Sequence, residues 1–242
     1  EEMGANLFPG FAGKEVLYGE DGKTVVGVRC GDKGLDKDGK PKSNFEPGID
    51  IEDLTHGFQR DNRHGFDETV YLLLTGKLPT KEELDDFSQH LSSLRALPDN
   101  FIKDMILSMK GRDVLNMLAR SVLGLYTLDE KADDISLGNM IEQTLNIIAK
   151  FPSIIAYSYQ ALKYAYQGRT LTIRHPQTNL TTAENFLYLV KGKYTKLEAD
   201  LLDLALVLHA EHGGGNNSTF TMRVTSSTET DIYSAVTSAI AS

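Results

Sequence analysis

The chain has 242 residues, 40% of them hydrophobic, which is enough to bury a sizeable core. Its 25 Lys and Arg against 34 Asp and Glu give a formal net charge of −9, and no basic face of the kind that nucleic-acid binding requires is evident. The single cysteine, Cys30, excludes an internal disulfide and fits a reducing compartment. No apolar run approaches the roughly 20 residues of a membrane-spanning helix, so we expect a soluble, cytoplasmic protein.

Residues 1–50 are expected to form an extended N-terminal segment, distinct from the rest of the chain. They contain ten of the 21 glycines and three of the seven prolines. Two short runs of β-branched and aromatic residues, 16–18 and 25–28, flank the dipeptide Asp21-Gly22. Asp-Gly between two such runs predicts a β-hairpin.

From residue 51 to 242 the apolar residues recur at helical spacing, which predicts an all-α, multi-helical domain after the short hairpin or irregular segment. Capping boxes of the form Thr-x-x-Glu begin at Thr80, Thr181 and Thr195, and Gly76 and Gly192 are placed to end helices. The expected helices include residues 66–74, 101–109, 114–125, 186–190 and 232–240, and a long one from Ile135 to Tyr166 in which Pro152 places a kink or break.

The segment from Leu197 to His212 is predicted to be a helix that is buried on all sides, because it is almost wholly apolar after Asp203. It ends in two histidines, His209 and His212. His212 continues the row formed by residues 197, 201, 204 and 208, so we expect its side chain to emerge where the core meets the loop that follows.

That loop, Gly213-Gly214-Gly215-Asn216-Asn217-Ser218, has the composition of a ligand-binding loop. The glycines allow a ligand to approach the backbone closely, and Asn216, Asn217 and Ser218 supply neutral donors. The carboxyl end of a helix favours an imidazolium by about 0.3–1 kcal/mol. The pattern therefore indicates a site for a small anion beside His212.

Four other interpretations of this segment stay open on the residues alone. The histidines could be hydrogen-bonded structural residues, or His209 and His212 could be a zinc pair, although no third ligand lies nearby. The three glycines could cradle a phosphate, but they lack a preceding strand and a helix directly after them. A serine hydrolase is disfavoured because the chain lacks a Gly-x-Ser-x-Gly elbow.

The whole stretch His209-Ala-Glu-His212-Gly-Gly-Gly-Asn216-Asn-Ser218-Thr219 resembles the signature of the citrate synthase family, His-x-Asp-His-x-x-x-Asn-x-Ser-Thr. Glu211 stands where the family commonly has Asp. Similar family segments are Gly48-Ile49-Asp50-Ile51-Glu52-Asp53-Leu54, residues 70–80, and Ala183-Glu184-Asn185-Phe186-Leu187-Tyr188. The resemblance covers about residues 48–242 in order, whereas residues 1–47 match poorly.

The resemblance implies a helical homodimer that condenses acetyl-CoA with oxaloacetate to citrate and CoA, a transferase of the tricarboxylic acid cycle without a metal or redox cofactor. By the family's pattern His212 binds the 2-oxo acid, and His209 and Asn216 line or support that pocket. For Arg223 we favour a buried ion pair over substrate binding. The helices near 114–125 and 135–166 are expected to form much of the dimer interface.

The family's thioester-polarising histidine, its aspartate base and its carboxylate-clamping arginines follow the last segment present here. His56, His64, His90 and His175 match none of these motifs and are expected at the surface or at helix ends. We therefore expect the chain to be the first part of the large domain, without catalytic residues of its own and inactive alone. Three alternatives stay open: a 2-methylcitrate synthase, a citryl-CoA-cleaving module, and a non-catalytic interaction module of the same fold.

Overall fold

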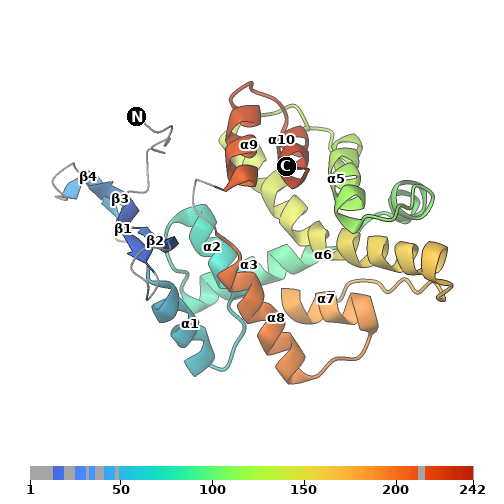
Figure 1. The fold of residues 1–242 in the computed structure, drawn as a ribbon, viewed down its shortest axis with the longest axis horizontal. Helices are drawn as coiled ribbons and strands as arrows, with labels where there is room; N and C mark the ends of the chain where they lie inside the picture. The colour runs from blue at the N-terminus through green and yellow to red at the C-terminus, as the bar shows by residue number, and fades with distance from the viewer. Residues whose placement is uncertain are drawn as a thin grey trace.

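The computed structural model describes residues 49–211 and 216–241, together with the backbone of four strands between residues 13 and 46. The fold is all-α from residue 51 onward, as the sequence predicts (Figure 1). Among these residues no helix has both the length and the apolar character needed to cross a membrane. The helices in chain order are α1 (Ile51–Arg60), α2 (Phe66–Thr75), α3 (Lys81–Ser93), α4 (Asp99–Phe101), η1 (Ile102–Leu107), α5 (Val114–Leu125), η2 (Tyr126–Leu128), α6 (Leu137–Gln167), α7 (Thr182–Lys191), α8 (Lys196–Leu208), α9 (Asn217–Ser226) and α10 (Ile232–Ile240).

The described strands form two separate antiparallel pairs. Strand β1 (Gly13–Tyr18) pairs with β2 (Val25–Cys30), which confirms the predicted hairpin; its Asp21-Gly22 connection lies outside the described residues. Strand β3 (Lys33–Leu35) pairs with β4 (Pro41–Glu46). The sequence did not predict this second pair, since β4 is mostly polar and lacks the alternation that marks a strand.

The helix boundaries follow local chemistry. All three predicted capping boxes form: the hydroxyls of Thr80, Thr181 and Thr195 accept from the backbone N–H three residues on, and the glutamate there accepts from the threonine N–H. Gly76 and Gly192 end α2 and α7 with φ of 77° and 80°, a backbone region that residues with a Cβ rarely adopt.

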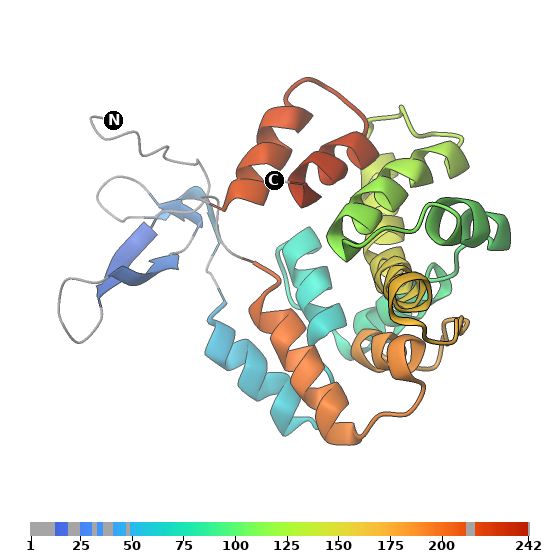
Figure 2. The same cartoon turned by 45° about the vertical axis from the view of Figure 1, so that its right-hand side comes forward.

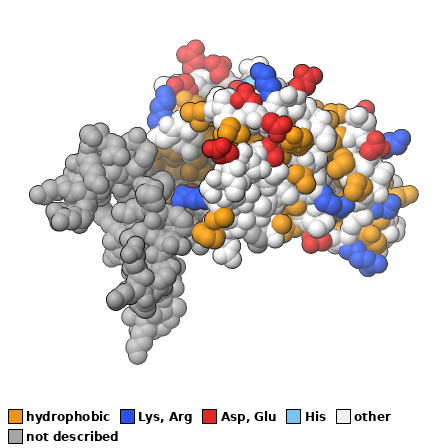
Figure 3. All heavy atoms as spheres, turned by 90° about the horizontal axis from the view of Figure 1, so that it is seen from above, with side chains coloured by type: hydrophobic (Ala, Val, Ile, Leu, Met, Phe, Trp, Pro, Cys, Tyr) orange, Lys and Arg blue, Asp and Glu red, His pale blue; other side chains and the backbone are white. Residues whose placement is uncertain are grey.

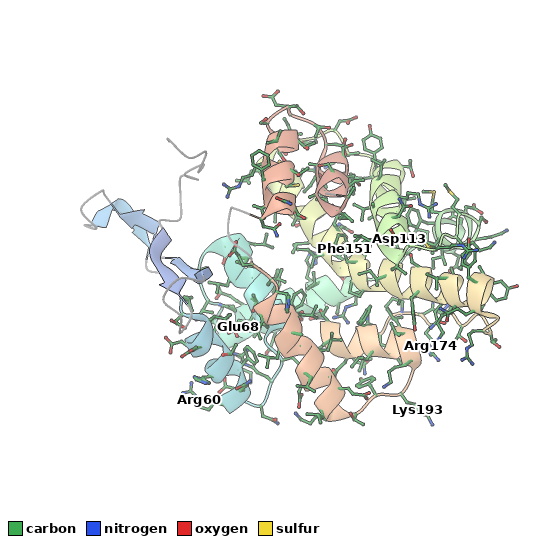
Figure 4. The ribbon with its side chains drawn as sticks, in the orientation of Figure 1. Arg60, Glu68, Asp113, Phe151, Arg174 and Lys193 are labelled. Atoms are coloured by element: carbon green, nitrogen blue, oxygen red, sulfur yellow. The ribbon has the colours of Figure 1, made fainter. Side chains whose placement is uncertain are left out.

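Helix α6 is the central element of the fold. It runs unbroken for 31 residues and includes Pro152, whose ring removes one backbone hydrogen bond and crowds the preceding turn. The helix changes direction near its middle (Figures 1 and 2), and Figure 4 labels Phe151, the neighbour of Pro152, at that bend. The kink that the sequence predicts is therefore present, without a break.

The main core gathers around α6. Side chains of η1, α5, α7 and α10 pack on it, and Ile106, Val122, Ile154 and Ala156 have no exposed surface. Two smaller clusters join this body, one between α3 and α6 and one between α1, α2 and α8. The cluster between α1, α2 and α8 packs against α8, whose C-terminal end carries the histidine motif.

The predicted helix 101–109 is present in a different form. It consists of the short α4 followed by a π-helical turn, η1, in which the N–H of Ser108 donates to the carbonyl of Lys103 at 2.9 Å. The wider turn keeps Phe101, Ile102 and Ile106 together in the core. The spacing of apolar residues in the sequence cannot distinguish this π-helical turn from an α-helix. The packing of its side chains in the core selects the wider turn.

The capping glutamates make stability depend on pH. The hydrogen bond from the backbone of Thr80 and the nearby Lys77 lower the pKa of Glu83 from 4.5 to about 2, and Lys191 and the backbone of Thr195 do the same for Glu198. Since the folded-state pKa values are depressed, this stabilisation is complete above pH 4.5 and is lost as the pH falls toward about 2. Urea unfolding at a series of pH values should show this loss.

The double variant Glu83→Gln/Glu198→Gln is expected to show a shallower loss of unfolding free energy over the same pH range, because two of the titrating groups are gone. Glu82→Gln is the matched control: it removes an exposed carboxylate from the same turn that does not cap the helix. An identical pH profile for the double variant and the wild type would contradict the assignment.

Candidate functional site

Helix α8 is buried on one side only. Ala199, Asp203 and Val207 are at most 3% exposed, whereas Leu197, Leu201 and Leu208 are 51–65% exposed. The prediction of a helix buried on all sides is therefore wrong for this chain. The reason is that α8 packs on α7, α2 and α1 through one face, and no other described element covers the face that carries the leucine row.

Helix α8 also ends earlier than predicted. Its last residue is Leu208, and His209 is the C-cap, with its backbone N–H donating to the carbonyl of Ala205. The ring Nδ1 of His209 lies 2.8 Å from the same carbonyl; since a carbonyl only accepts, Nδ1 donates this hydrogen bond. His209 thus lies at the negative pole of α8, where we had expected His212.

Asn216 begins the next helix, α9. Its side-chain Oδ1 accepts from the N–H groups of Ser218 and Thr219 at 2.9 and 3.3 Å, the geometry of an N-cap. A helix therefore does follow the glycine-rich segment, contrary to our reading of it. His212 and Gly213–Gly215 lie outside the described residues.

Arg223 is exposed on α9, so the expectation that it is buried is wrong. The reason is that α9 has no buried residue at all and packs mainly on α10. His56, His90 and His175 are exposed, and His64 lies at a helix end, directly before the N-cap of α2, with its side chain only 15% exposed.

The segment 209–216 connects two helix ends of opposite polarity. Helix α8 presents its carbonyl end to it, which favours a protonated imidazole, and α9 presents its N–H end, which favours an anion. The end of α8 and the start of α9 lie on the same side of the helical body (Figure 2). The arrangement suits a small ligand with carboxylate groups next to a histidine.

A buried carboxylate that the sequence analysis did not single out holds α8 in place. Asp203 is 2% exposed, and its Oδ2 and Oδ1 accept from the backbone N–H groups of Gly65 and Phe66 at 2.6 and 3.2 Å. These are N–H groups at the first turn of α2 that have no partner within that helix. Burial raises the pKa of Asp203, and the two hydrogen bonds offset part of that effect. An aspartate within an apolar helix was the available signal.

His64 joins the turn before α2 to α7 and α8 through its side chain. Its Nδ1 lies 2.6 Å from Oγ1 of Thr181, the N-cap of α7, and its Nε2 lies 3.1 Å from Oδ1 of Asp200 on α8. The turn between α1 and α2 therefore contacts both α7 and α8. Sequence reasoning missed this contact because 117 and 136 residues separate the partners.

Two arginines complete the polar surroundings of this turn. The guanidinium of Arg63 donates to both carboxylate oxygens of Glu68, at 2.9 and 3.0 Å, and Figure 4 labels Glu68 on α2. Arg95, only 2% exposed, donates to the carbonyls of Gln177 and Leu180 and so fixes the loop before α7. A cavity of about 380 Å³ lies between Arg63, His64, α3 and that loop.

Among the residues that the structure describes, no three His, Cys, Asp or Glu side chains are grouped as a metal site would require. His212, one half of the zinc pair considered above, lies outside that set.

Comparison with known proteins identifies the family. The family model for the C-terminal domain of citrate synthase matches residues 36–242. The chain belongs to the citrate synthase family. It is 41% identical over 199 residues to the citrate synthase of Haloferax volcanii, covering 80% of this chain and 49% of that protein. It is 31% identical over 221 residues to the citrate/2-methylcitrate synthase of Bacillus subtilis, covering 83% and 58%.

A solved structure shows the same fold. The citrate synthase of Thermoplasma acidophilum, in a ternary complex with carboxymethyl coenzyme A and oxaloacetate, superposes with a TM-score of 0.69 at 25% identity, covering 81% of this chain and 49% of that chain. The chain thus spans about half the length of the curated relatives that it matches.

The contact of Asp203 with α2 can be tested by mutation. Asp203→Ala leaves the N–H groups of Gly65 and Phe66 without their acceptor in a buried site, and we expect it to lower the free energy of unfolding by about 1–3 kcal/mol. Urea denaturation measures the change. Asp86→Asn, at an exposed position on α3, is the control and should stay within about 0.5 kcal/mol of the wild type. An Asp203→Ala variant as stable as the control would refute the role of this carboxylate.

Proposed function

We propose that the full-length protein is a citrate synthase that condenses acetyl-CoA with oxaloacetate to give citrate and CoA. The observation that carries this proposal is the family motif at the junction of α8 and α9, with His209 at the C-terminal end of one helix and Asn216 capping the other. Family membership supports the reaction class, and the opposite polarity of the two helix ends supports a dicarboxylate ligand.

In this proposal His212 donates a hydrogen bond to oxaloacetate, and its protonated form offsets part of the ligand's negative charge. His209 supports the pocket from the end of α8, where its Nδ1 is already held by the carbonyl of Ala205. Asn216 fixes the start of α9, since its Oδ1 accepts from the N–H groups of Ser218 and Thr219.

The condensation also requires an acid that polarises the thioester carbonyl and a base that removes a proton from the acetyl group. We assign neither role to residues 1–242, and the prediction that this segment has no turnover alone stays a prediction. We propose no metal or redox cofactor, because proton transfer and charge stabilisation are enough for this reaction. The thioester is a substrate.

A 2-methylcitrate synthase is the alternative that a specific observation favours, since a relative at 31% identity is named citrate/2-methylcitrate synthase. The two activities differ by one methylene of the acyl group, which a pocket discriminates by about 1–3 kcal/mol. Comparing kcat/KM of the full-length protein for acetyl-CoA and propionyl-CoA decides between them.

His212→Ala in the full-length protein tests the proposed oxaloacetate site. Loss of a charge-assisted hydrogen bond of about 1.5–3 kcal/mol should raise the KM for oxaloacetate by about ten- to a hundredfold. Following CoA release at varied oxaloacetate concentrations measures it. The KM for acetyl-CoA should change far less.

His90→Ala is the matched control, because His90 is an exposed histidine on α3 that contacts only Glu142, at 3.5 Å, among its described ion-pair partners. It should leave both KM values unchanged. An unchanged oxaloacetate KM in His212→Ala would show that the site is elsewhere.

We further propose that two copies of the protein associate through α5 and the first half of α6. Leu115 and Leu123 on α5 are 56% and 46% exposed, and Leu137 and Ile141 on α6 are 75% and 40% exposed. An open groove of about 560 Å³ beside Leu123 extends this apolar surface. Figure 3 views the molecule from the side of α5, α9 and α10 and shows hydrophobic side chains among the charged ones. Leucine exposure on this scale is typical of an interface that a partner covers.

The double variant Leu115→Glu/Leu123→Glu is expected to be monomeric, because association would bury two unpaired carboxylates at each copy. Sedimentation velocity on the full-length protein measures the mass. Leu115→Met/Leu123→Met keeps the surface apolar and should remain dimeric. A glutamate variant with the wild-type mass would place the interface elsewhere.

A further inference from the structure

One lysine differs from the other lysines of the described chain in its surroundings. Lys150, on α6, donates from Nζ to the carbonyl of Leu94 at 2.8 Å and to Oδ1 of Asn146 at 2.7 Å. Both acceptors are neutral. Within the described residues no carboxylate lies within ion-pair distance of Lys150, whereas Lys77 and Lys196 pair with Glu83 and Asp200 at 3.1 and 2.7 Å.

The ammonium of Lys150 is therefore less favoured than that of an ordinary lysine. Burial lowers its pKa, and no negative partner restores it. Hydrogen bonds to a carbonyl and an amide oxygen can be donated by a neutral amine as well as by an ammonium. A neutral amine has a lone pair and is a nucleophile, and desolvation is a recognised way of activating lysine.

Lys150 also borders a cavity. It lines a cavity of about 210 Å³ together with Asn139, Gln143 and Asn146 from the same face of α6. A water molecule occupies about 30 Å³ in the liquid. The cavity is several times larger, so a small acyl group fits in it.

The two carboxylates that line this cavity are engaged with other groups. Asp129 accepts from the hydroxyl of Tyr233 at 2.8 Å and from Nε2 of Gln143 at 2.7 Å. Glu142 lies 3.5 Å from Nε2 of His90. Neither of them neutralises Lys150 through a direct contact.

The face that carries Lys150 is distinct from the proposed dimer surface. Nine residues separate Lys150 from the exposed Ile141, and at about 100° per residue they lie on opposite sides of the helix. Association through Ile141 and Leu137 therefore leaves the cavity uncovered by that contact.

From this geometry we propose that Lys150 is a site of N-acylation by acyl-CoA thioesters. The acyl donor is the substrate class of the proposed function, and in that respect the inference rests on it. The lone pair of Nζ attacks the thioester carbonyl carbon, an N–C bond forms and the C–S bond breaks. The CoA thiolate leaves and takes up the proton that the nitrogen loses, so the products are an N-acyl-lysine and CoA.

The test uses the folded full-length protein with acetyl-CoA and without oxaloacetate. Peptide mass spectrometry gives the initial rate of acetylation at Lys150 and at the ion-paired Lys196. At neutral pH the rate at Lys150 should be severalfold higher. At pH about 10 the ratio should fall, because a substantial fraction of an ordinary lysine is then neutral as well.

Two controls separate the local environment from the reagent. In protein unfolded with urea the two lysines should react at similar rates, because the burial that distinguishes them is gone. Lys150→Arg keeps hydrogen-bond donors at this position, removes the nucleophile and should abolish acetylation there alone. The comparison within wild-type protein does not depend on the folding of this variant.

A rate ratio of one or below at neutral pH in the folded protein would overturn the proposal. So would a preference for Lys150 with acetic anhydride but not with acetyl-CoA, since it would show that the thioester cannot reach the amine. The readout is independent of condensation, which a parallel assay with oxaloacetate follows. Acetylation of Lys150 in the first assay with no citrate in the second would refute the proposed function alone, and the reverse result would refute this inference alone.

Discussion

The carboxylate of Asp203 is the interaction on which the candidate site depends. Helix α8 has only one buried face, and three of its leucines are exposed, so apolar packing alone holds it weakly in this chain. Asp203 joins that face to the start of α2 through two backbone N–H groups that otherwise lack partners. Burial makes the negative charge unfavourable, as the raised pKa of Asp203 shows, and removal of the acceptor would be still more unfavourable. The position of the histidine motif at the end of α8 follows from this contact.

Both ends of the connection between α8 and α9 are helix caps. His209 occupies the C-cap of α8 and Asn216 the N-cap of α9, so each of these motif residues has a structural role beside the proposed binding role. A substitution at either position would therefore alter a helix end as well as the pocket.

Helix α6 shows how one element can serve several surfaces. One face is buried in the main core, a second exposes Leu137 and Ile141, and a third presents the polar row that ends at Lys150. The bend at Pro152 lets the second half of the helix turn and pack on α7 while the first half stays against α5 and α10. The 31 residues of α6 make more than eight turns, so each face of the helix carries several residues of its own.

The sequence by itself determined the helical class, the family, the three capping boxes, the glycine helix ends and the kink at Pro152. These features depend on residues within a few positions of one another, and Thr-x-x-Glu or a proline within a helix acts in the same way in any surroundings. Only the tertiary structure decided that α8 is exposed on its leucine row, that His64 is partly buried, that Arg223 is exposed and that residues 102–107 form a π-turn. Each of these depends on which distant element packs against the residue. Asp203 and Gly65 are 138 residues apart in the chain, and no local pattern encodes their contact.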